Sequence, residues 1–332
     1  MRVFPNGFGL ILGLLTTFVV SWIWPLGKGS QEVFFSDWFS KLAVVLIFLI
    51  QGWYLKFDRL RTIGKSSYSL LRVQGLIFFG PLFIVLLFEY FGFLPEKWIA
   101  GFYFLAILPT TISSCVVYTA IAGGNSDVSL GHATLSNILA IFWVPIGWIL
   151  LSAGSGHSLP SQWITFGGEV LPNLFLLVVL PCITGWKINK TLKAGHSKKL
   201  SFISQMIAFS CILMLVYLAI SKNIMLFGRD YFGLLIVELL PFLIAFLICH
   251  TALSWWGNGV FSVDSEHRVA EFYCVGQKSL VMGLPFLSLL QDQFNTPVDL
   301  IACPLIIYHF LQLGVGACFF TKLRGVVSGS SA

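Results

Sequence analysis

Ten long apolar segments, separated by short polar connections, decide what this chain can fold into. They cover residues 8–26, 37–55, 67–91, 98–121, 127–153, 168–186, 201–221, 231–255, 265–290 and 298–320. Each is close to the roughly 20 residues that a helix needs to cross a bilayer. Only 10% of the 332 residues are charged and 57% are hydrophobic, which leaves no room for a sizeable soluble domain. We therefore expect an all-α polytopic membrane protein with ten transmembrane helices.

The lysine and arginine residues are divided unevenly between the two sides that ten spans define. Fourteen of the 20 fall on the side of the amino terminus, most of them in the connections 56–65 and 187–199. Positive charge accumulates in cytoplasmic loops. We expect an integral protein of a bacterial plasma (inner) membrane with both termini in the cytoplasm. The net charge of +6 follows from this asymmetry and gives no indication of nucleic-acid binding.

Ten spans divide into two sets of five, and an odd number in each set gives the two halves opposite orientations. We expect inverted repeats at about 1–155 and about 160–324, within a single membrane domain over 1–324. The small, polar tail 325–332 is expected to be disordered or a vector-derived remnant. All seven cysteines lie inside apolar segments, which indicates packing residues and no disulfide framework.

The fourth and ninth spans, at matching positions in the two halves, both contain helix-breaking sequences. In the fourth, Pro109 is followed by hydroxyl side chains at Thr110, Thr111, Ser113 and Ser114. Backbone groups freed by proline must be satisfied inside the protein or by cavity water. The hydroxyls and loosened carbonyls could coordinate a small cation or a polar solute. The competing interpretation is that they bond back to the helix beside a kink.

The ninth span contains Gly276-Gln277-Lys278-Ser279, followed by Gly283 and Pro285. Lys278 lies about 13 residues into this span, which is ~20 Å deep at ~1.5 Å per helical residue. The side chain is too short to reach the interface from there, so it must face a cavity or a partner. Paired interruptions at matching positions predict a binding site at mid-membrane. We expect non-helical backbone in both spans, with the two interruptions packed against each other.

Two other ionisable side chains lie within apolar segments. Glu238, three residues before Pro241, is interpreted as the only carboxylate well inside an apolar run and hence as a candidate proton or counter-ion site. His309 is a second candidate, with a neutral, hydrogen-bonded histidine as the alternative. In the fifth span, Ser129, His132 and Ser136 fall on one helix face and form a polar stripe that serves either a ligand or hydrogen bonds between helices.

The chain carries no zinc-protease motif, no nucleophile elbow and no phosphate-binding loop. We therefore expect neither an enzyme nor an ATP-driven pump, and no cofactor other than a coupling ion.

Five stretches together resemble the bile acid:sodium symporter superfamily. They are Leu108–Ser114 (LPTTISS), Ala122–Asn125 (AGGN), Thr134–Asn137 (TLSN), Cys274–Leu280 (CVGQKSL) and Gly283–Pro285 (GLP). The chain looks like the SBF-like branch of this superfamily, which includes bacterial members and the seventh member of the vertebrate bile-acid carrier family. The resemblance spans about 1–324. It implies a panel domain and a core domain, in which the fourth and ninth helices unwind and cross.

The resemblance also implies alternating-access transport of a small organic anion, with sodium as a coupling ion. Carried over by motif, one sodium site would use Ser113, Ser114, Ser129 and Thr134, and the other Gln74 and Gln277. The chain departs from the bile-acid branch where that branch has an acidic residue four positions before the motif glutamine. This position is Tyr273, and the cation Lys278 follows the glutamine. Sodium coupling therefore stays open.

Two alternatives remain. One is proton-coupled or uncoupled transport that uses Lys278 with Glu238 or His309. The other is a membrane regulator that transports nothing and modulates calcium or lipid-precursor handling. The expected partners are a small organic anion, with Ser279 among the candidate contacts, and membrane lipid. The sequence defines no oligomeric state.

The predicted orientation is testable by cysteine labelling. A membrane-impermeant thiol reagent applied outside intact cells should not label Lys190→Cys beyond the level of the parent protein, because the 187–199 connection is expected to be cytoplasmic. Labelling should appear after the cells are permeabilised. Labelling in intact cells would contradict both the orientation and the inverted repeat.

Overall fold

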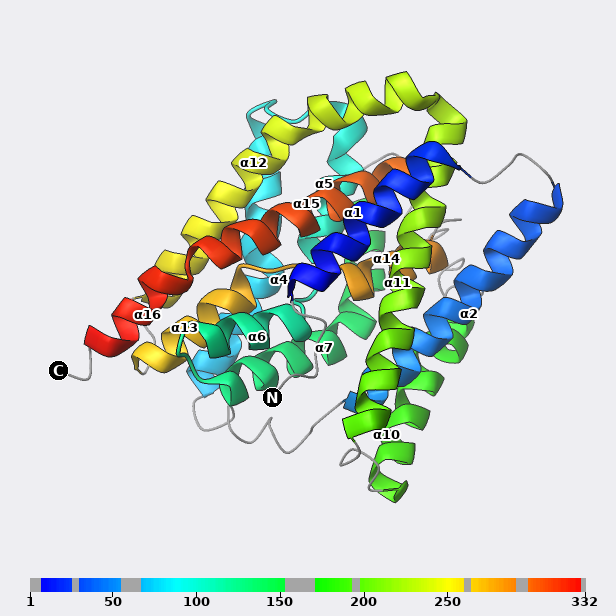
Figure 1. Ribbon diagram of the computed structural model, residues 1–332. Helices are drawn as coiled ribbons and strands as arrows, with labels where there is room; N and C mark the ends of the chain where they lie inside the picture. The colour runs from blue at the N-terminus through cyan, green and yellow to red at the C-terminus, as the bar shows by residue number, and fades with distance from the viewer. Residues whose placement is uncertain are drawn as a thin grey trace. The chain divides into compact units, whose positions relative to one another are not determined.

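The structure is a computed structural model that describes residues 7–25, 30–54, 67–152, 171–192, 198–259, 264–290 and 298–329. Within these ranges the regular elements are helices, and no strand occurs among the described residues (Figure 1). The prediction of an all-helical fold is confirmed for the part of the chain that the structure describes.

Helices lie at all ten predicted apolar segments. In the first half they are α1 (Gly7–Ile23), α2 (Ser30–Tyr54), α4 (Ser67–Tyr90), α5 (Glu96–Ile107), α6 (Ser113–Ile121) and α7 (Ser126–Ser152). In the second half they are α9 (Leu171–Leu174), the π-helical turn η3 (Phe175–Val179), α10 (Leu180–Leu192), α11 (Lys198–Phe227), α12 (Arg229–Gly259), α13 (Ser265–Val275), α14 (Leu280–Leu290), α15 (Val298–Cys318) and α16 (Phe320–Gly329). Helix α16 continues through Gly329, and 330–332 lie outside the described residues.

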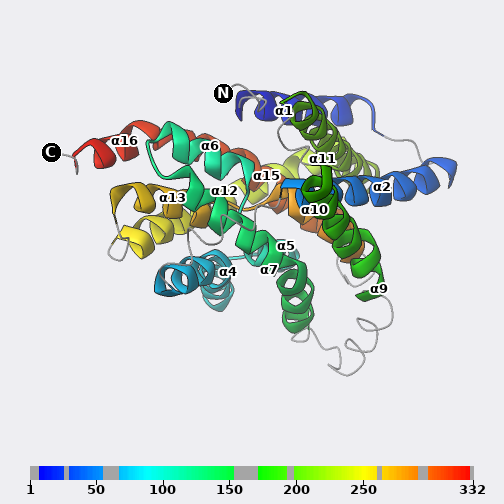
Figure 2. The ribbon, with the colours of Figure 1, turned by 90° about the horizontal axis from the view of Figure 1, so that it is seen from below.

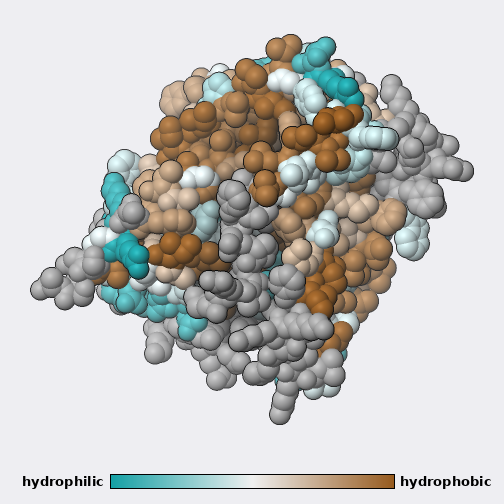
Figure 3. Space-filling model, in the orientation of Figure 1, coloured by the Kyte–Doolittle hydropathy of each residue, from teal (hydrophilic) through white to brown (hydrophobic). Residues whose placement is uncertain are grey.

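Five described helices are long and apolar enough to cross a membrane. These stretches are Tyr68–Tyr90, Ser126–Leu151, Ile203–Met225, Arg229–Gly257 and Leu300–Cys318. Helix α12 carries large apolar side chains on its exposed face, including Leu234, Val237 and Ile248. Figure 3 shows apolar surface where Figure 1 draws this helix. Exposed apolar side chains along such long helices are suited to contact with lipid.

The two predicted interruptions are present. The chain leaves the helical conformation at 108–112, between α5 and α6, and at 276–279, between α13 and α14. The backbone N–H of Ser279 donates to the carbonyl oxygen of Pro109 at 2.9 Å, so the two interruptions touch. Helix α14 begins at Leu280, so Gly283 and Pro285 lie inside a helix and not in the break. Both the breaks and their mutual contact are confirmed.

The chain forms two compact units, each built from three stretches. One contains Met1–Leu55, Ile149–Glu238 and Gly283–Ala302, and the other contains Lys56–Trp148, Leu239–Met282 and Cys303–Ala332. In the second unit, α13 packs against α4, α6 and α16, and α4 packs against α5. Figures 1 and 2 both show α13 beside α6. Both interruptions belong to this second unit.

In the first unit, α2 and α10 approach each other closely at two glycines. A Cβ atom on Gly52 would overlap the carbonyl oxygen of Cys182, and one on Gly185 would overlap that of Leu49. Small residues that allow close backbone approach are typical of helix contacts in membranes. The side chain of Asn189 fixes the same contact by donating to the Trp53 carbonyl at 2.8 Å.

The close approach of α2 and α10 predicts a selective effect of alanine. Gly52→Ala should lower the thermal unfolding midpoint in detergent, because overpacking of this kind costs about 1–3 kcal/mol. Gly75→Ala is the matched control, since a Cβ there meets nothing within 4 Å. The control should leave the midpoint unchanged or raise it, as alanine favours a helix by about 1 kcal/mol over glycine. Equal midpoints for the two variants would contradict the described packing.

Candidate functional site

The ammonium group of Lys278 lies at the contact between the two helix interruptions. Its side chain is fully buried, and its Nζ donates to three backbone carbonyl oxygens. The acceptors are Ile77 at 2.6 Å, Ala106 at 2.8 Å and Leu108 at 2.7 Å. An ammonium has three N–H donors, so all of them are satisfied. The sequence prediction of an internally paired lysine agrees with this geometry, and the partners are carbonyl dipoles.

Each of these three carbonyls is available for a local reason. Pro81 lies inside α4 and has no backbone N–H, so the carbonyl of Ile77, four residues earlier, has no helical donor. Ala106 lies in the last turn of α5, and Leu108 is its C-cap residue. Carbonyls at a helix C-terminus have no partner within the helix and carry its partial negative charge. Lys278 therefore binds where the backbone has released acceptors.

The neighbouring Gln277 joins the interruption of the ninth span to that of the fourth. Its Oε1 accepts from the hydroxyl of Thr111 at 2.7 Å and from that of Ser114 at 2.6 Å. Its Nε2 is buried and has no hydrogen-bond partner among the described residues. The structure thus brings together three of the predicted site residues, with one amide N–H₂ left to bind a ligand or water.

Gln312, on α15, holds the main chain of Lys278. The Lys278 backbone N–H donates to Gln312 Oε1 at 2.7 Å, and Gln312 Nε2 donates to the Lys278 carbonyl at 2.8 Å. The same Nε2 lies 2.7 Å from Nδ1 of the buried His309. His309 therefore contacts the site through an amide, in the manner of a hydrogen-bonded histidine. Ser279, also buried, lies at the start of α14, where its Oγ accepts from the Met282 N–H at 3.2 Å.

Asn137, on α7, joins the fifth span to the interruption of the fourth span. The Asn137 side chain donates to the Thr110 carbonyl at 3.0 Å and to the Ala133 carbonyl at 2.8 Å. The hydroxyls of Thr110 and Thr134 are both buried and have no hydrogen-bond partner among the described residues. Asn137 therefore belongs to the site, and in the sequence it was marked only as the last residue of the TLSN motif.

The remaining predicted contacts lie elsewhere. Gln74 Nε2 donates to the carbonyl of His132 at 3.2 Å. Ser129 Oγ lies 3.4 Å from the sulfur of Cys115 and 3.5 Å from that of Cys274. Ser113 is exposed at the first position of α6. Of the residues predicted for the two sodium sites, Ser114 and Gln277 share a hydrogen bond in the described part of the chain.

The interpretation of Glu238 as the only carboxylate well inside an apolar run is wrong. Glu238 lies on the exposed face of α12. Glu271, on α13, is the fully buried carboxylate, and it accepts from Arg72 at 2.5 Å and from Ser69 at 2.7 Å. The sequence could have indicated this residue, because Glu271 lies between Ala270 and Phe272 inside the ninth apolar segment.

The sequence patterns also gave no indication of the buried His250. His250, on α12, is fully buried, and its Nδ1 lies 2.6 Å from the hydroxyl of Tyr308 on α15. Both residues pack against the ring of Phe246. No motif in the sequence marks this pair.

Comparison with known proteins gives consistent matches over nearly the whole chain. The model of the SBF-like CPA transporter family matches residues 9–325. Sodium/bile acid cotransporter 7-B of Xenopus laevis is 26% identical over an aligned length of 326, an alignment that covers 95% of this chain and 91% of that protein. Sodium/bile acid cotransporter 7 of Rattus norvegicus is 26% identical over an aligned length of 296, which covers 86% of this chain and 83% of that protein.

A bacterial relative is similar over a comparable length. The Escherichia coli (strain K12) protein named "Putative symporter YfeH" is 26% identical over an aligned length of 340, an alignment that covers 98% of this chain and 95% of that protein. The names of these relatives describe transporters, and none describes an enzyme. The resemblance drawn from the five motif stretches is confirmed.

The Glu271–Arg72 pair predicts a stability effect that a double-mutant experiment can isolate. Glu271→Gln should lower stability by about 3–5 kcal/mol, because it leaves the Arg72 charge in a buried position without its carboxylate. Adding Arg72→Gln should recover part of that loss. Glu238→Gln, at an exposed carboxylate, is the matched control and should have little effect on the unfolding midpoint in detergent. Additive losses in the double variant would contradict a direct pairing.

Proposed function

The chain belongs to the SBF-like CPA transporter family, and on this basis we propose that it is a secondary active transporter of a small organic anion. The observation that carries the proposal is the Lys278 ammonium, held by three carbonyls where two interrupted helices meet. Interrupted helices that meet within a membrane protein are typical of solute-binding sites in secondary transporters.

The proposal includes the architecture expected from the sequence. Ten spans form two inverted repeats of five, with a panel and a core, and alternating access moves the solute. The interruptions between α5 and α6 and between α13 and α14 support it, because they occur in the fourth span of one half and in the corresponding span of the other. The proposal also includes a location in the plasma membrane with both termini in the cytoplasm.

An anionic solute follows from the electrostatics of the two breaks. Lys278 neutralises the partial negative charge at the C-terminus of α5. Helices α6 and α14 begin at Ser113 and Leu280, so their N-termini also lie at the breaks. The N-cap residue of α6 makes no side-chain capping bond. Helix N-termini favour anions, so a carboxylate or sulfonate is the expected solute group, and Thr110, Thr111 and Ser279 are candidate contacts.

Sodium coupling at these residues is poorly supported by the same geometry. Hard cations need oxygen lone pairs, with carboxylates as strong ligands. The Gln277 oxygen already accepts two hydroxyl donors, and the released carbonyls of Ile77, Ala106 and Leu108 accept the ammonium. The proposal is that Lys278 takes the place of a bound cation. Transport then requires no sodium at this position and proceeds by exchange or by proton coupling.

Substitution of Lys278 tests this function. In proteoliposomes and in thermal-shift assays, a panel of organic carboxylates, sulfonates and phosphates should include at least one that the unmodified protein binds without sodium. Lys278→Gln and Lys278→Ala should weaken that response by about tenfold, because they leave the partial negative charge at the C-terminus of α5 uncompensated beside an anionic solute. Lys41→Gln, at an exposed lysine on α2, is the matched control.

The dependence on sodium and pH distinguishes the coupling modes. Removal of the ammonium frees three carbonyl oxygens, so a response that becomes sodium-dependent in Lys278→Ala would support replacement of a cation by the lysine. A sodium requirement in the unmodified protein would contradict it. An unaltered solute response in both Lys278 variants, with unaltered ion dependence, would show that the lysine is structural.

A further inference from the structure

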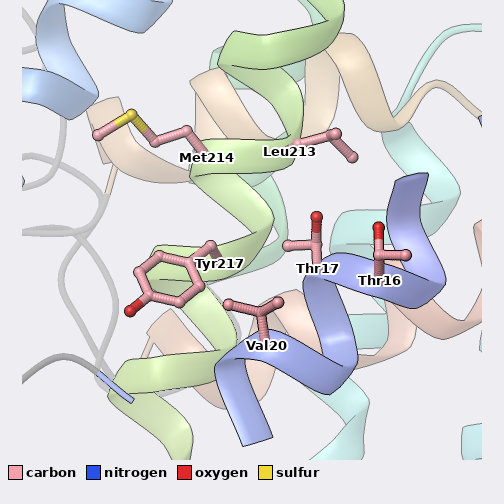
Figure 4. A pocket seen from close by; sticks show the side chains of 6 residues that line it. All are labelled: Thr16, Thr17, Val20, Leu213, Met214 and Tyr217. Carbon is pink, nitrogen blue, oxygen red and sulfur yellow. The ribbon is translucent and has the colours of Figure 1, made fainter. Parts of the chain in front are cut away.

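A groove lies between α1 and α11, in the first compact unit. Its volume is about 360 Å³, and it is lined by Thr16, Thr17, Val20, Leu213, Met214 and Tyr217 (Figure 4). This volume lies within the range of roughly 300–1,000 Å³ that small-molecule sites occupy. None of these residues contributes to the site around Lys278.

The packing of the two helices explains why the groove exists. At its Gly13 end the helices touch, because a Cβ on Gly13 would lie 2.5 Å from the Phe209 ring and 3.3 Å from the Leu213 side chain. At its other end, the hydroxyl of Tyr217 donates to the carbonyl of Trp24 at 2.8 Å. The short side chains of α1 between these two contacts leave the space open.

The wall of the groove presents hydrocarbon. The hydroxyls of Thr16 and Thr17 both donate to the carbonyl of Gly13 at 2.8 Å, so they are satisfied within α1. Val19 and Val20 are each 52% exposed along the same helix. An apolar recess on membrane-embedded helices is best filled by an apolar chain, because water there would lack hydrogen-bond partners.

Charged and aromatic groups lie just beyond the Tyr217 end of the groove. Arg229 is exposed at the start of α12, and its Nη2 donates to the carbonyl of Ile23 at 2.9 Å. A guanidinium has five N–H donors, so this bond leaves donors for a phosphate. Asp230 follows directly and is also exposed. Trp24, 78% exposed at the end of α1, is a residue type found at the membrane interface.

We propose that this groove binds a phospholipid, with one acyl chain between α1 and α11 and the phosphate on Arg229. The adjacent carboxylate of Asp230 matches a headgroup that carries a primary ammonium, so the occupant is assigned as phosphatidylethanolamine. The proposal does not depend on the proposed transport function, since the groove and the Lys278 site share no residue.

Native mass spectrometry of the purified full chain in detergent tests the groove. With dioleoyl-phosphatidylethanolamine as the probe, Val20→Trp should remove one bound lipid, because the indole fills the recess. Val19→Trp, equally exposed but outside the lining, should not. Thr16→Phe is a second filling variant if Val20→Trp does not fold. An unchanged number of bound lipids in the filling variants would overturn the proposal.

Headgroup recognition is tested on the same instrument. Arg229→Gln should weaken binding by about tenfold, as expected for a charge-assisted bond. Lys97→Gln, at another exposed cation, should not weaken it. Asp230→Asn should reduce the preference for phosphatidylethanolamine over dioleoyl-phosphatidylcholine by about fivefold. A preference of the unmodified protein for dioleoyl-phosphatidylglycerol would overturn the headgroup assignment. Unaltered affinity in Arg229→Gln would overturn the phosphate contact.

Discussion

The site depends on one interaction, the bonding of a buried ammonium to three backbone carbonyls that no helix satisfies. In a membrane interior, an unsatisfied carbonyl costs several kcal/mol, and an unpaired ammonium costs at least as much. Pro81 releases the carbonyl of Ile77, and the end of α5 releases those of Ala106 and Leu108. The lysine and the interruptions are therefore mutually dependent. The ammonium satisfies carbonyls that would otherwise be unpaired, and the carbonyls stabilise an ammonium that would otherwise be buried without partners.

Two glutamine side chains fix the orientation of the backbone around this charge. Gln312 forms two hydrogen bonds with the main chain of Lys278, which fixes the residue where its backbone is not helical. Gln277 points toward α6 and accepts from Thr111 and Ser114. Adjacent residues of one interruption thus bind different elements. A single substitution there disturbs the backbone geometry together with the local charge, which makes comparison with conservative variants essential.

Sequence patterns predicted the depth of polar groups but not the direction in which they face. Proline and glycine located both interruptions, and the position of Lys278 required an internal partner. Its partners could not be named, because a released backbone carbonyl has no side-chain signature. For the Ile77 carbonyl, the sequence offered only Pro81, four residues later. Glu238 and Glu271 show the same limit. Both lie in apolar segments, yet Glu238 is exposed on α12 while Glu271 is buried against Arg72. Hydropathy does not predict which face of a helix is turned inward. It also does not predict a basic partner 199 positions away in the sequence.

The covalent attachment of the Lys278 charge has a thermodynamic consequence for a transporter. A bound sodium ion dissociates on either side of the membrane and so links the solute gradient to an ion gradient. An ammonium on a side chain supplies a similar local field but never leaves the protein, so that link is absent at this position. Energy for uphill transport must then come from a second solute, from a proton or from an ion bound elsewhere.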